Sequence, residues 1–344
     1  MSHTPERTDK PTDVSPHSIA SELPERVLHT YSRLWQLETW LRRLVYIELR
    51  ALAGDEWRLK IRGADSPWEA DKRLTHMPTT ESDPLSYVQF SELRRITSDD
   101  WRLFEPFLPP KSIWEVKLEE ISQIRHRIAH FRRGHHDDLQ RVIQLLRDLD
   151  PGFWRFCTSY NDAHPILPQS DDPVESHFLH LDPFPWGEMS NGKWARTGIA
   201  DPEARLGVMV EVLCRPWAAW SIPAAGKAGF LYDVTIHARQ LSHLNYRRLI
   251  EGTSGFREQL VHVCLDGLAK TVRVTIPAIL GADRVIQIVE KLHEACLYCL
   301  VSGLGRPDAD AVQRFADSLP EYVLGPENPL TFLAPDMPCS FFGA

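Results

Sequence analysis

The sequence lacks the features that mark secreted, membrane-spanning and nucleic-acid-coating proteins. Its 344 residues include six cysteines, scattered without the spacing of a disulfide framework, so we expect reduced thiols. No stretch approaches the roughly 18 consecutive apolar residues of a membrane span, and the polar N-terminus lacks the apolar run of a signal peptide. The net charge of −8 excludes a globally basic coat protein. These absences predict a cytoplasmic protein that does not bind membranes.

Common cofactor and hydrolase motifs are missing as well. The C-terminal half has no nucleophile elbow, phosphate loop or dinucleotide fingerprint, and we expect no cofactor. Cys296 and Cys299 form one Cys-x-x-Cys, but both fall on an apolar helical stripe, which favours buried core thiols over a metal site. The segment His135-His136-Asp137-Asp138 leaves a metal site open as an alternative. The favoured interpretation is a helix start, where aspartate faces the positive end of the helix dipole, so we predict no bound metal.

The hydrophobic pattern predicts an α+β protein of two domains. Residues 1–23 are rich in Ser, Thr, Pro and Asp and predict a disordered tail. Residues 24–155 predict an all-α bundle, and residues 156–205 a linker of irregular structure. Residues 206–344 predict an α+β domain with a mostly antiparallel sheet and helices on one face; a sensor, regulatory or RNA-binding role is open to it.

Helical periodicity sets the expected elements of the N-terminal half. The first helix runs from about Pro24 to Ala53, with Gly54 as its cap, because leucines recur there at three- and four-residue spacing. A long connection (55–86) and two short helices (85–97 and 99–107) follow. We then expect helices over 112–133, stopped by Gly134, and over 137–149, ending before Pro151.

In the C-terminal half, alternating apolar residues predict strands over 206–213, 230–238, 259–265 and 271–276. The last two flank Asp266-Gly267, a strong hairpin signal. Helices are expected over 241–251, 282–301 and 310–318.

A cluster of cations and imidazoles dominates the helix predicted over 112–133. Residues 124–133 read Ile-Arg-His-Arg-Ile-Ala-His-Phe-Arg-Arg, without an acid. Ile121, Ile124, Ile128 and Phe131 form an apolar stripe expected to pack on the first helix, which leaves His126 and His130 on the opposite face. Unpaired charge is costly in a core, so this face is expected to hold a phosphate, an acidic partner or a second copy of itself.

Two further side chains bear on this cluster. Arg125 lies to one side of the helix, and its long stem is expected to bend toward His130. Glu38 of the first helix has two interpretations. It either pairs with Arg42 four residues later, or it orients an arginine of the cluster.

The segment from Arg125 to His130 resembles the Arg-x4-His signature of the HEPN superfamily of RNA-cutting helical domains, with His126 in the polar place after the arginine. The first helix (Leu34-Trp-Gln-Leu-Glu-Thr-Trp-Leu-Arg-Arg-Leu) resembles the opening helix of defence-associated members. The similarity covers about residues 25–150. It implies a four-to-five-helix bundle that dimerises with two motif helices facing across one cleft. It also implies a metal-independent endoribonuclease of toxin or anti-phage type.

The residue types suit this chemistry. Attack of a ribose 2′-OH on the adjacent phosphate needs a proton acceptor and donor, and histidine serves as either near neutral pH. A guanidinium offers bidentate donors to phosphoryl oxygens. We assign His130 as general acid/base, Arg125 as phosphate clamp and His126 as an assisting group. Arg127, Arg132 and Arg133 would hold the RNA backbone, while Glu38 is auxiliary.

The expected products are 2′,3′-cyclic phosphate and 5′-OH ends. The expected partners are RNA, a second copy that completes the site, and an antitoxin or phage-derived trigger. The alternative is a catalytically inactive HEPN-like module that binds RNA or a protein partner through the same basic face.

Overall fold

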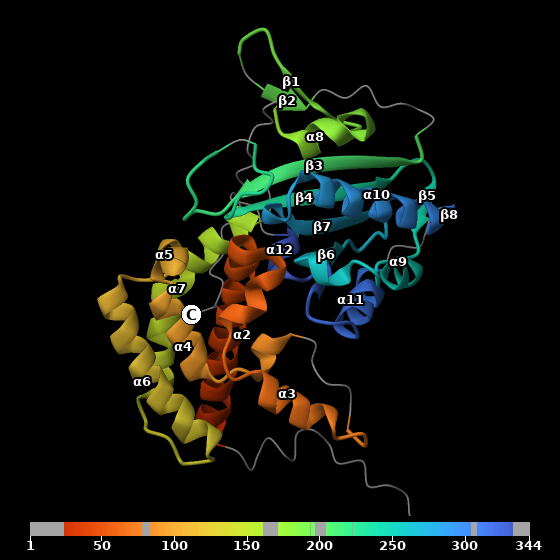
Figure 1. Ribbon diagram of the computed structural model, residues 1–344. Helices are drawn as coiled ribbons and strands as arrows, with labels where there is room; N and C mark the ends of the chain where they lie inside the picture. The colour runs from red at the N-terminus through yellow and green to blue at the C-terminus, as the bar shows by residue number, and fades with distance from the viewer. Residues whose placement is uncertain are drawn as a thin grey trace, which may run out of the picture.

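The computed structural model describes residues 24–77, 83–160, 171–192, 194–196, 204–221, 223–303 and 308–332. The tail predicted over 1–23 lies outside the described residues, as does part of the linker predicted over 156–205. The described chain combines a helical N-terminal region with a mostly antiparallel sheet, as the sequence predicts (Figure 1).

The helical region is built around one long helix, α2 (Glu25–Ala53). Its predicted leucine face is buried, and Gly54 caps it with a φ of 55°. The other helices pack beside it (Figure 1): α4 (Phe90–Asp99), α5 (Trp101–Phe104), α6 (Lys111–Ala129) and α7 (Asp138–Tyr160). None of the described helices has the length and apolarity needed to cross a membrane.

The connection predicted over 55–86 contains more structure than the sequence indicated. A 3-10 helix, η1 (Gly54–Lys60), follows α2 directly, and α3 (Asp65–Lys72) and η2 (Pro84–Tyr87) come next. These elements are short, and α3 buries no residue, which explains the weak periodicity. The two short helices predicted next correspond to α4 and to α5 with η3 (Glu105–Phe107).

The predicted end of the fourth main helix is wrong, because α7 continues through Pro151 to Tyr160. Just after the proline, Gly152 allows a close contact: a Cβ at this position would lie 1.8 Å from the carbonyl oxygen of Phe107, so only glycine lets α7 approach η3 so closely. Beyond it, Phe153, Phe156 and Cys157 are buried. Packing of these side chains favours the helix past the proline, and the predicted boundary at residue 155 falls inside α7.

The main sheet has the strand order β3-β4-β7-β6-β9, and all its pairs are antiparallel except β6–β9. Its strands are β3 (Leu206–Cys214), β4 (Phe230–Ala238), β6 (His262–Leu265), β7 (Thr271–Pro277) and β9 (Val323–Leu324). The predicted hairpin is confirmed as β6–β7, and the predicted strands are found with shifted ends. The short β9 lacked enough residues to produce an alternating pattern.

Smaller elements surround this sheet. The sequence did not predict α8 (Pro173–Phe178), η4 (Leu179–Leu181) or the two-stranded pairs β1 (Trp186–Glu188) with β2 (Trp194–Arg196) and β5 (Ser242–Leu244) with β8 (Leu300–Ser302). The helices α9 (Tyr246–Gly252), α10 (Ala282–Tyr298) and α11 (Ala309–Asp317) correspond to the predicted helices. The predicted start at 241 and end at 301 are wrong, because β5 and β8 occupy these ends. Two 3-10 helices, η5 (Arg257–Gln259) and η6 (Ala278–Leu280), and the short α12 (Pro329–Phe332) complete the described chain.

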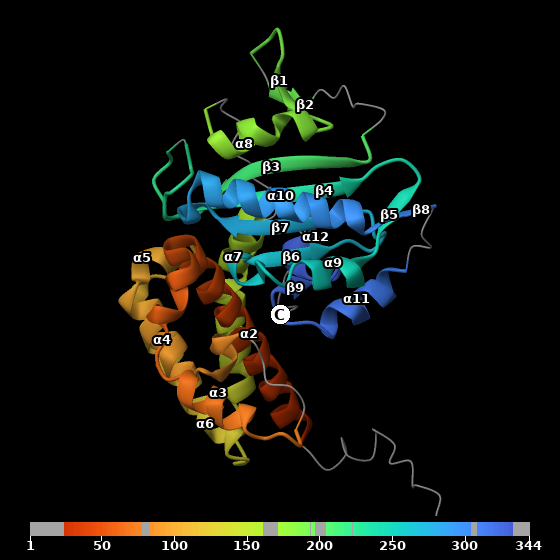
Figure 2. The same cartoon turned by 45° about the vertical axis from the view of Figure 1, so that its right-hand side comes forward.

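Alternate residues of the central strands enter two different cores. Val212 and Tyr232 join the core formed with α10, which lies across one face of the sheet (Figure 2). Leu213 and Leu231, which are register partners, join the core of the helical region. The prediction of helices on one face is therefore incomplete, since α2 and α7 also contact the sheet. Cys296 and Cys299 are buried in the α10 core, so they are core thiols as favoured.

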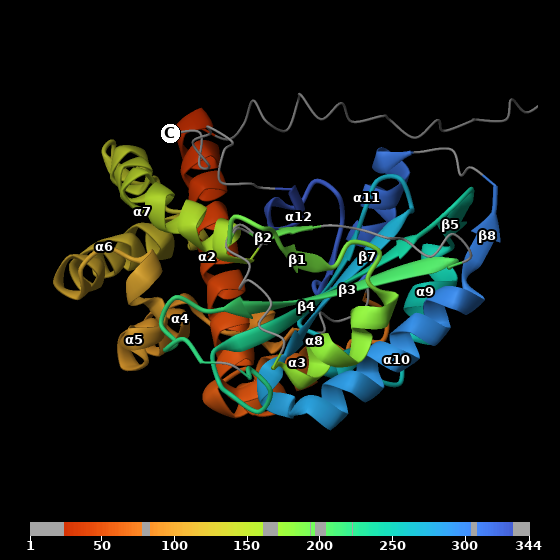
Figure 3. The same ribbon diagram turned by 90° about the horizontal axis from the view of Figure 1, so that it is seen from above.

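A buried ion pair joins the two regions. Glu48 of α2 and Arg215, which directly follows β3, are both fully buried, with 2.6 Å between Glu48 Oε1 and Arg215 Nη2. Trp217 donates its indole N–H to the same carboxylate at 2.6 Å. Seen from above, α2 and α7 stand at one end of the sheet (Figure 3).

Candidate functional site

The motif helix ends earlier than the sequence indicated. α6 stops at Ala129, and His130 is its C-cap residue. The N–H of Phe131 donates to the carbonyl of Ile128, and that of Arg132 to the carbonyl of Arg127, which is the bond pattern of a Schellman motif. Phe131 has a φ of 55°, so a bulky side chain occupies the left-handed position that usually takes glycine.

This ending corrects the predicted apolar stripe. Ile121, Ile124 and Ile128 are buried as expected, but the side chain of Phe131 is 96% exposed. The left-handed turn at Phe131 directs its ring away from the core that the helical periodicity would have given it. The segment 124–133 therefore presents an aromatic ring beside its imidazoles.

The two motif histidines lie on the surface, as the helix geometry predicts. His126 and His130 are both exposed, and their ring centroids are 4.4 Å apart at an interplanar angle of 64°. Two imidazoles in this arrangement can share one phosphate, with one ring accepting a proton and the other donating one.

Arg125 is held by an acid from α2. Its Nε and Nη2 donate to the two carboxylate oxygens of Glu38, at 2.8 and 3.2 Å. Glu38 also accepts from Arg42 Nη2 at 2.5 Å, so both interpretations of this acid describe a real contact. The guanidinium lies 5.9 Å from the ring centroid of Phe90. It is turned toward α2 and, within the described chain, has no hydrogen bond to His130, toward which we expected it to bend.

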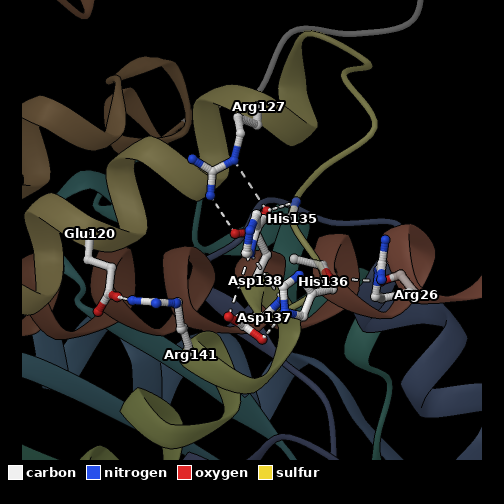
Figure 4. Close-up of polar contacts among 9 residues, drawn as sticks. Arg26, Glu120, Arg127, His135, His136, Asp137, Asp138 and Arg141 are labelled. Atoms are coloured by element: carbon white, nitrogen blue, oxygen red, sulfur yellow. Dashed lines mark hydrogen bonds and ion pairs between the residues drawn. The ribbon is translucent and has the colours of Figure 1, made fainter.

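Arg127, which is predicted to hold the RNA backbone, contacts the next helix. It forms a two-point ion pair with Asp138 at the start of α7, which is 2% exposed (Figure 4). The backbone N–H of His135 donates to the same carboxylate at 2.7 Å. Burial alone would raise the pKa of Asp138, but the bonds from Arg127 and His135 outweigh it and hold the pKa below its ordinary value.

This ion pair predicts an acid-sensitive contribution to stability. A carboxyl whose pKa is lowered on folding stabilises the fold above its unfolded pKa of about 3.9, and the contribution disappears as the pH falls through the folded pKa. Asp138→Asn is expected to lower the free energy of unfolding by about 1.5–3 kcal/mol at pH 7, a difference that shrinks below about pH 4. Urea unfolding at pH 7 and below pH 4 measures this difference, with the exposed Asp148→Asn as control. An equal difference at both pH values would contradict this assignment.

The remaining cations of the cluster are exposed, including Arg132 and Arg133. Beyond them, His135 and His136 are exposed at the turn into α7 (Figure 4). One nitrogen of each and a carboxylate oxygen of Asp137 lie within 4.8 Å of one another. This spacing is compatible with the alternative that the turn binds a metal ion. Asp138 is not part of this group, because it pairs with Arg127.

The chain matches no family model, no curated protein and no solved structure. The resemblance to HEPN domains therefore rests on the motif and the order of the helices. Sequence reasoning did not find the aromatic neighbour Phe90 or the partner of Arg127, because both come from other elements. Asp138 itself could have indicated the partner of Arg127, because it is an acid in the segment that follows the cationic helix.

Proposed function

We propose that the chain is a metal-independent endoribonuclease of toxin or anti-phage type that acts in the cytoplasm as a dimer. The observation that carries the proposal is the pair of exposed imidazoles at the end of α6, 4.4 Å apart, next to a partly exposed arginine fixed by Glu38. This group of side chains has the donors and acceptors that cleavage by a ribose 2′-OH requires.

The roles follow from the contacts. Glu38 occupies Nε and Nη2 of Arg125 and leaves Nη1 for a phosphoryl oxygen. A guanidinium already oriented by an acid stabilises the charge of the pentavalent intermediate without rearrangement. His130, at the exposed end of the helix, acts as general acid or base and His126 assists it. Arg132 and Arg133 hold the RNA backbone, and Arg127 fixes the turn into α7 through Asp138.

The outer face of α6 supports the dimer. Val116, Gln123 and His130 follow at seven-residue spacing and are all exposed, so they lie on nearly one line of the helix. Val116 is 69% exposed, and Ile113 on the same face is 49% exposed. A second copy packed along this line would cover the apolar side chains and bring two histidine pairs together.

Val116→Glu is therefore expected to separate the dimer and reduce RNA cleavage together. A carboxylate buried at this line without a partner costs free energy. We expect the dissociation constant of the dimer to rise by more than about tenfold, which corresponds to roughly 1.4 kcal/mol. Analytical ultracentrifugation and a cleavage assay over protein concentration measure both effects. Leu268→Glu, in the β6–β7 turn and also exposed, is the control. A dimer that survives Val116→Glu would place the interface elsewhere.

The decisive test is the chemistry of the cut ends. Purified protein, with and without EDTA, is incubated with RNA, and the products are analysed for 2′,3′-cyclic phosphate and 5′-OH termini. Cleavage with these ends in EDTA supports the proposal. Loss of cleavage in EDTA overturns the metal-free mechanism and points to His135, His136 and Asp137.

A second candidate is an inactive HEPN-like module that binds RNA or a protein through the same face. The contacts of Arg125 favour it, because Glu38 already binds two nitrogens of this guanidinium. Expression in cells separates the two. An active nuclease slows growth, unless an antitoxin inhibits it or it requires a phage-derived trigger that the cells lack. Changing His130 relieves the growth defect. RNA binding without cleavage, with or without metal, supports the inactive module.

A further inference from the structure

A cavity of about 670 Å³ lies between α2 and the C-terminal segments of the chain. One wall is a stripe of α2 at three- and four-residue spacing: Trp35, Thr39, Arg42, Arg43, Tyr46 and Arg50. The opposite wall comes from η5, α11 and the segment around β9. Its volume falls within the range of about 300–1,000 Å³ typical of small-molecule sites. Five arginines line it: Arg42, Arg43, Arg50, Arg58 and Arg257.

Arg50 carries the strongest sign that this cavity takes an anion. Only 3% of its side chain is exposed, yet Nε and Nη2 have no hydrogen-bond partner among the described residues. Its one ion pair there is long, 3.8 Å from Nη1 to the carboxylate of Asp55. A buried guanidinium with two unused donor atoms needs an explanation, because such groups are almost always satisfied.

Two more polar atoms of the wall are buried without a partner in the described chain. They are Nε of Arg257 and the hydroxyl of Tyr322. The guanidinium of Arg257 lies 5.8 Å from the ring centroid of Tyr322, so the two groups are neighbours. Three cavity-lining side chains on two walls thus carry buried polar atoms without a partner in the described chain.

The acids of the cavity do not supply the missing partners. Asp83 accepts the backbone N–H of Leu85 at 2.8 Å, and Glu321 accepts from the hydroxyl of Ser86. Asp317 accepts from the amide of Gln313 at 2.8 Å, and Glu258 is exposed. Nε and Nη2 of Arg50 and Nε of Arg257 therefore keep no partner among the described residues.

Aromatic rings complete the wall. Trp57 is 4% exposed and contacts Tyr46 edge to face, with 5.0 Å between ring centroids. Tyr46 is fixed in turn, because its hydroxyl donates to the carbonyl of Val261 at 2.7 Å. Tyr46 and Trp57 thus form a rigid aromatic part of the wall, against which a planar ring can stack.

We propose that this cavity binds a small nucleotide, with its phosphate on Arg50, Arg257 and Tyr322 and its base against the aromatic wall. Guanidinium groups bind phosphate through paired N–H donors, and the aromatic rings recognise the base by stacking. The binding site stands on the cavity alone and does not depend on RNA cleavage.

The cavity also communicates with the motif helix. Arg42 lines the cavity and donates to the Glu38 carboxylate that orients Arg125. A ligand atom that accepts a hydrogen bond from Arg42 and draws it from Glu38 leaves this carboxylate to Arg125 alone. Nucleotide binding thereby changes the position of Arg125; this second step rests on the proposed nuclease function.

Calorimetry on the full chain tests the site with AMP, inorganic phosphate and adenosine. AMP is expected to bind, and both fragments at least about tenfold more weakly. Arg50→Met is expected to weaken AMP binding about 10–100-fold, the range for a lost hydrogen bond between charged groups. Without ligand, its melting temperature should equal or exceed that of the parent, because a buried unsatisfied charge is removed. The exposed Arg147→Met is the matched control.

The outcomes separate the claims. Absence of AMP binding, or AMP binding unaffected by both Arg50→Met and Tyr322→Phe, overturns the site. Equal affinity for AMP and phosphate overturns the stacked base. If AMP binds but leaves the rate of an active nuclease unchanged, the link through Glu38 is wrong. If AMP binds and no RNA is cut under any condition, the nuclease proposal fails while the nucleotide site stands.

Discussion

His130→Ala is expected to slow RNA cleavage by about 10²–10⁴-fold, the usual contribution of a general acid or base. The imidazole is exposed at the C-cap of α6 and contacts the His126 ring rather than the core. Its removal should therefore leave the fold intact. Single-turnover cleavage, measured with excess protein on a labelled RNA, reports the chemical step directly.

The control for this experiment is His76→Ala, because His76 is also exposed and lies outside the motif helix. Melting temperatures of both variants should match the parent. A pH–rate profile adds a second measurement: the parent should show one limb for an acid and one for a base, and His130→Ala should lose one of them. A variant that cuts as fast as the parent would remove His130 from the mechanism.

The sequence predicted best where one helix face or one strand determines its own burial. The leucine face of α2, the strands β3 and β4 and the β6–β7 hairpin follow from local periodicity. The end of α6 does not, since Phe131 continues the apolar spacing but adopts a left-handed conformation. Pro151 led to the opposite error, a predicted helix end that is too early. The tight contact of Gly152 with Phe107 depends on tertiary packing, which the local sequence does not show.

The candidate site shows the same limit. The motif alone identified the exposed imidazoles, but the partners of its arginines come from elsewhere in the chain. Glu38 lies 87 residues before Arg125, and Asp138 lies 11 residues after Arg127. A sequence shows that a cation is present, while only the fold shows whether an acid already neutralises it. Arg50 is the converse case, a charge in the last turn of α2 that proves to be buried.

Breaking the Glu48–Arg215 pair is expected to have the largest effect on stability. Arg215 donates Nε and Nη2 to Glu48, at 3.1 and 2.6 Å, and Nη1 to the carbonyl of Ser159 in α7 at 3.3 Å. Its guanidinium also lies 5.8 Å from the ring centroid of Phe107 and 5.9 Å from that of Phe156. This arrangement joins α2, α7 and the end of β3 away from water.

Glu48→Gln should therefore lower the free energy of unfolding by about 3–5 kcal/mol, because it leaves the arginine charged, buried and without its counter-ion. Arg215→Met should lower the free energy of unfolding by a similar amount, because it leaves the Glu48 carboxylate buried and without its counter-ion. Urea unfolding with an unchanged m-value would show that stability alone has changed. A loss below about 1 kcal/mol would mean that water reaches the pair.

The combined variant decides whether the pair stabilises the junction or only specifies it. Glu48→Leu with Arg215→Met removes both charges, and Trp217→Phe removes the indole N–H that would otherwise lose its acceptor. Replacing a buried ion pair by apolar side chains is often neutral or stabilising, so the triple variant should recover most of the loss. The double-mutant cycle for the two charges should then show strong coupling. If stability recovers, apolar packing from Leu213 and Leu231 is sufficient to hold the two regions together. The role of the ion pair is then to orient the sheet on α2.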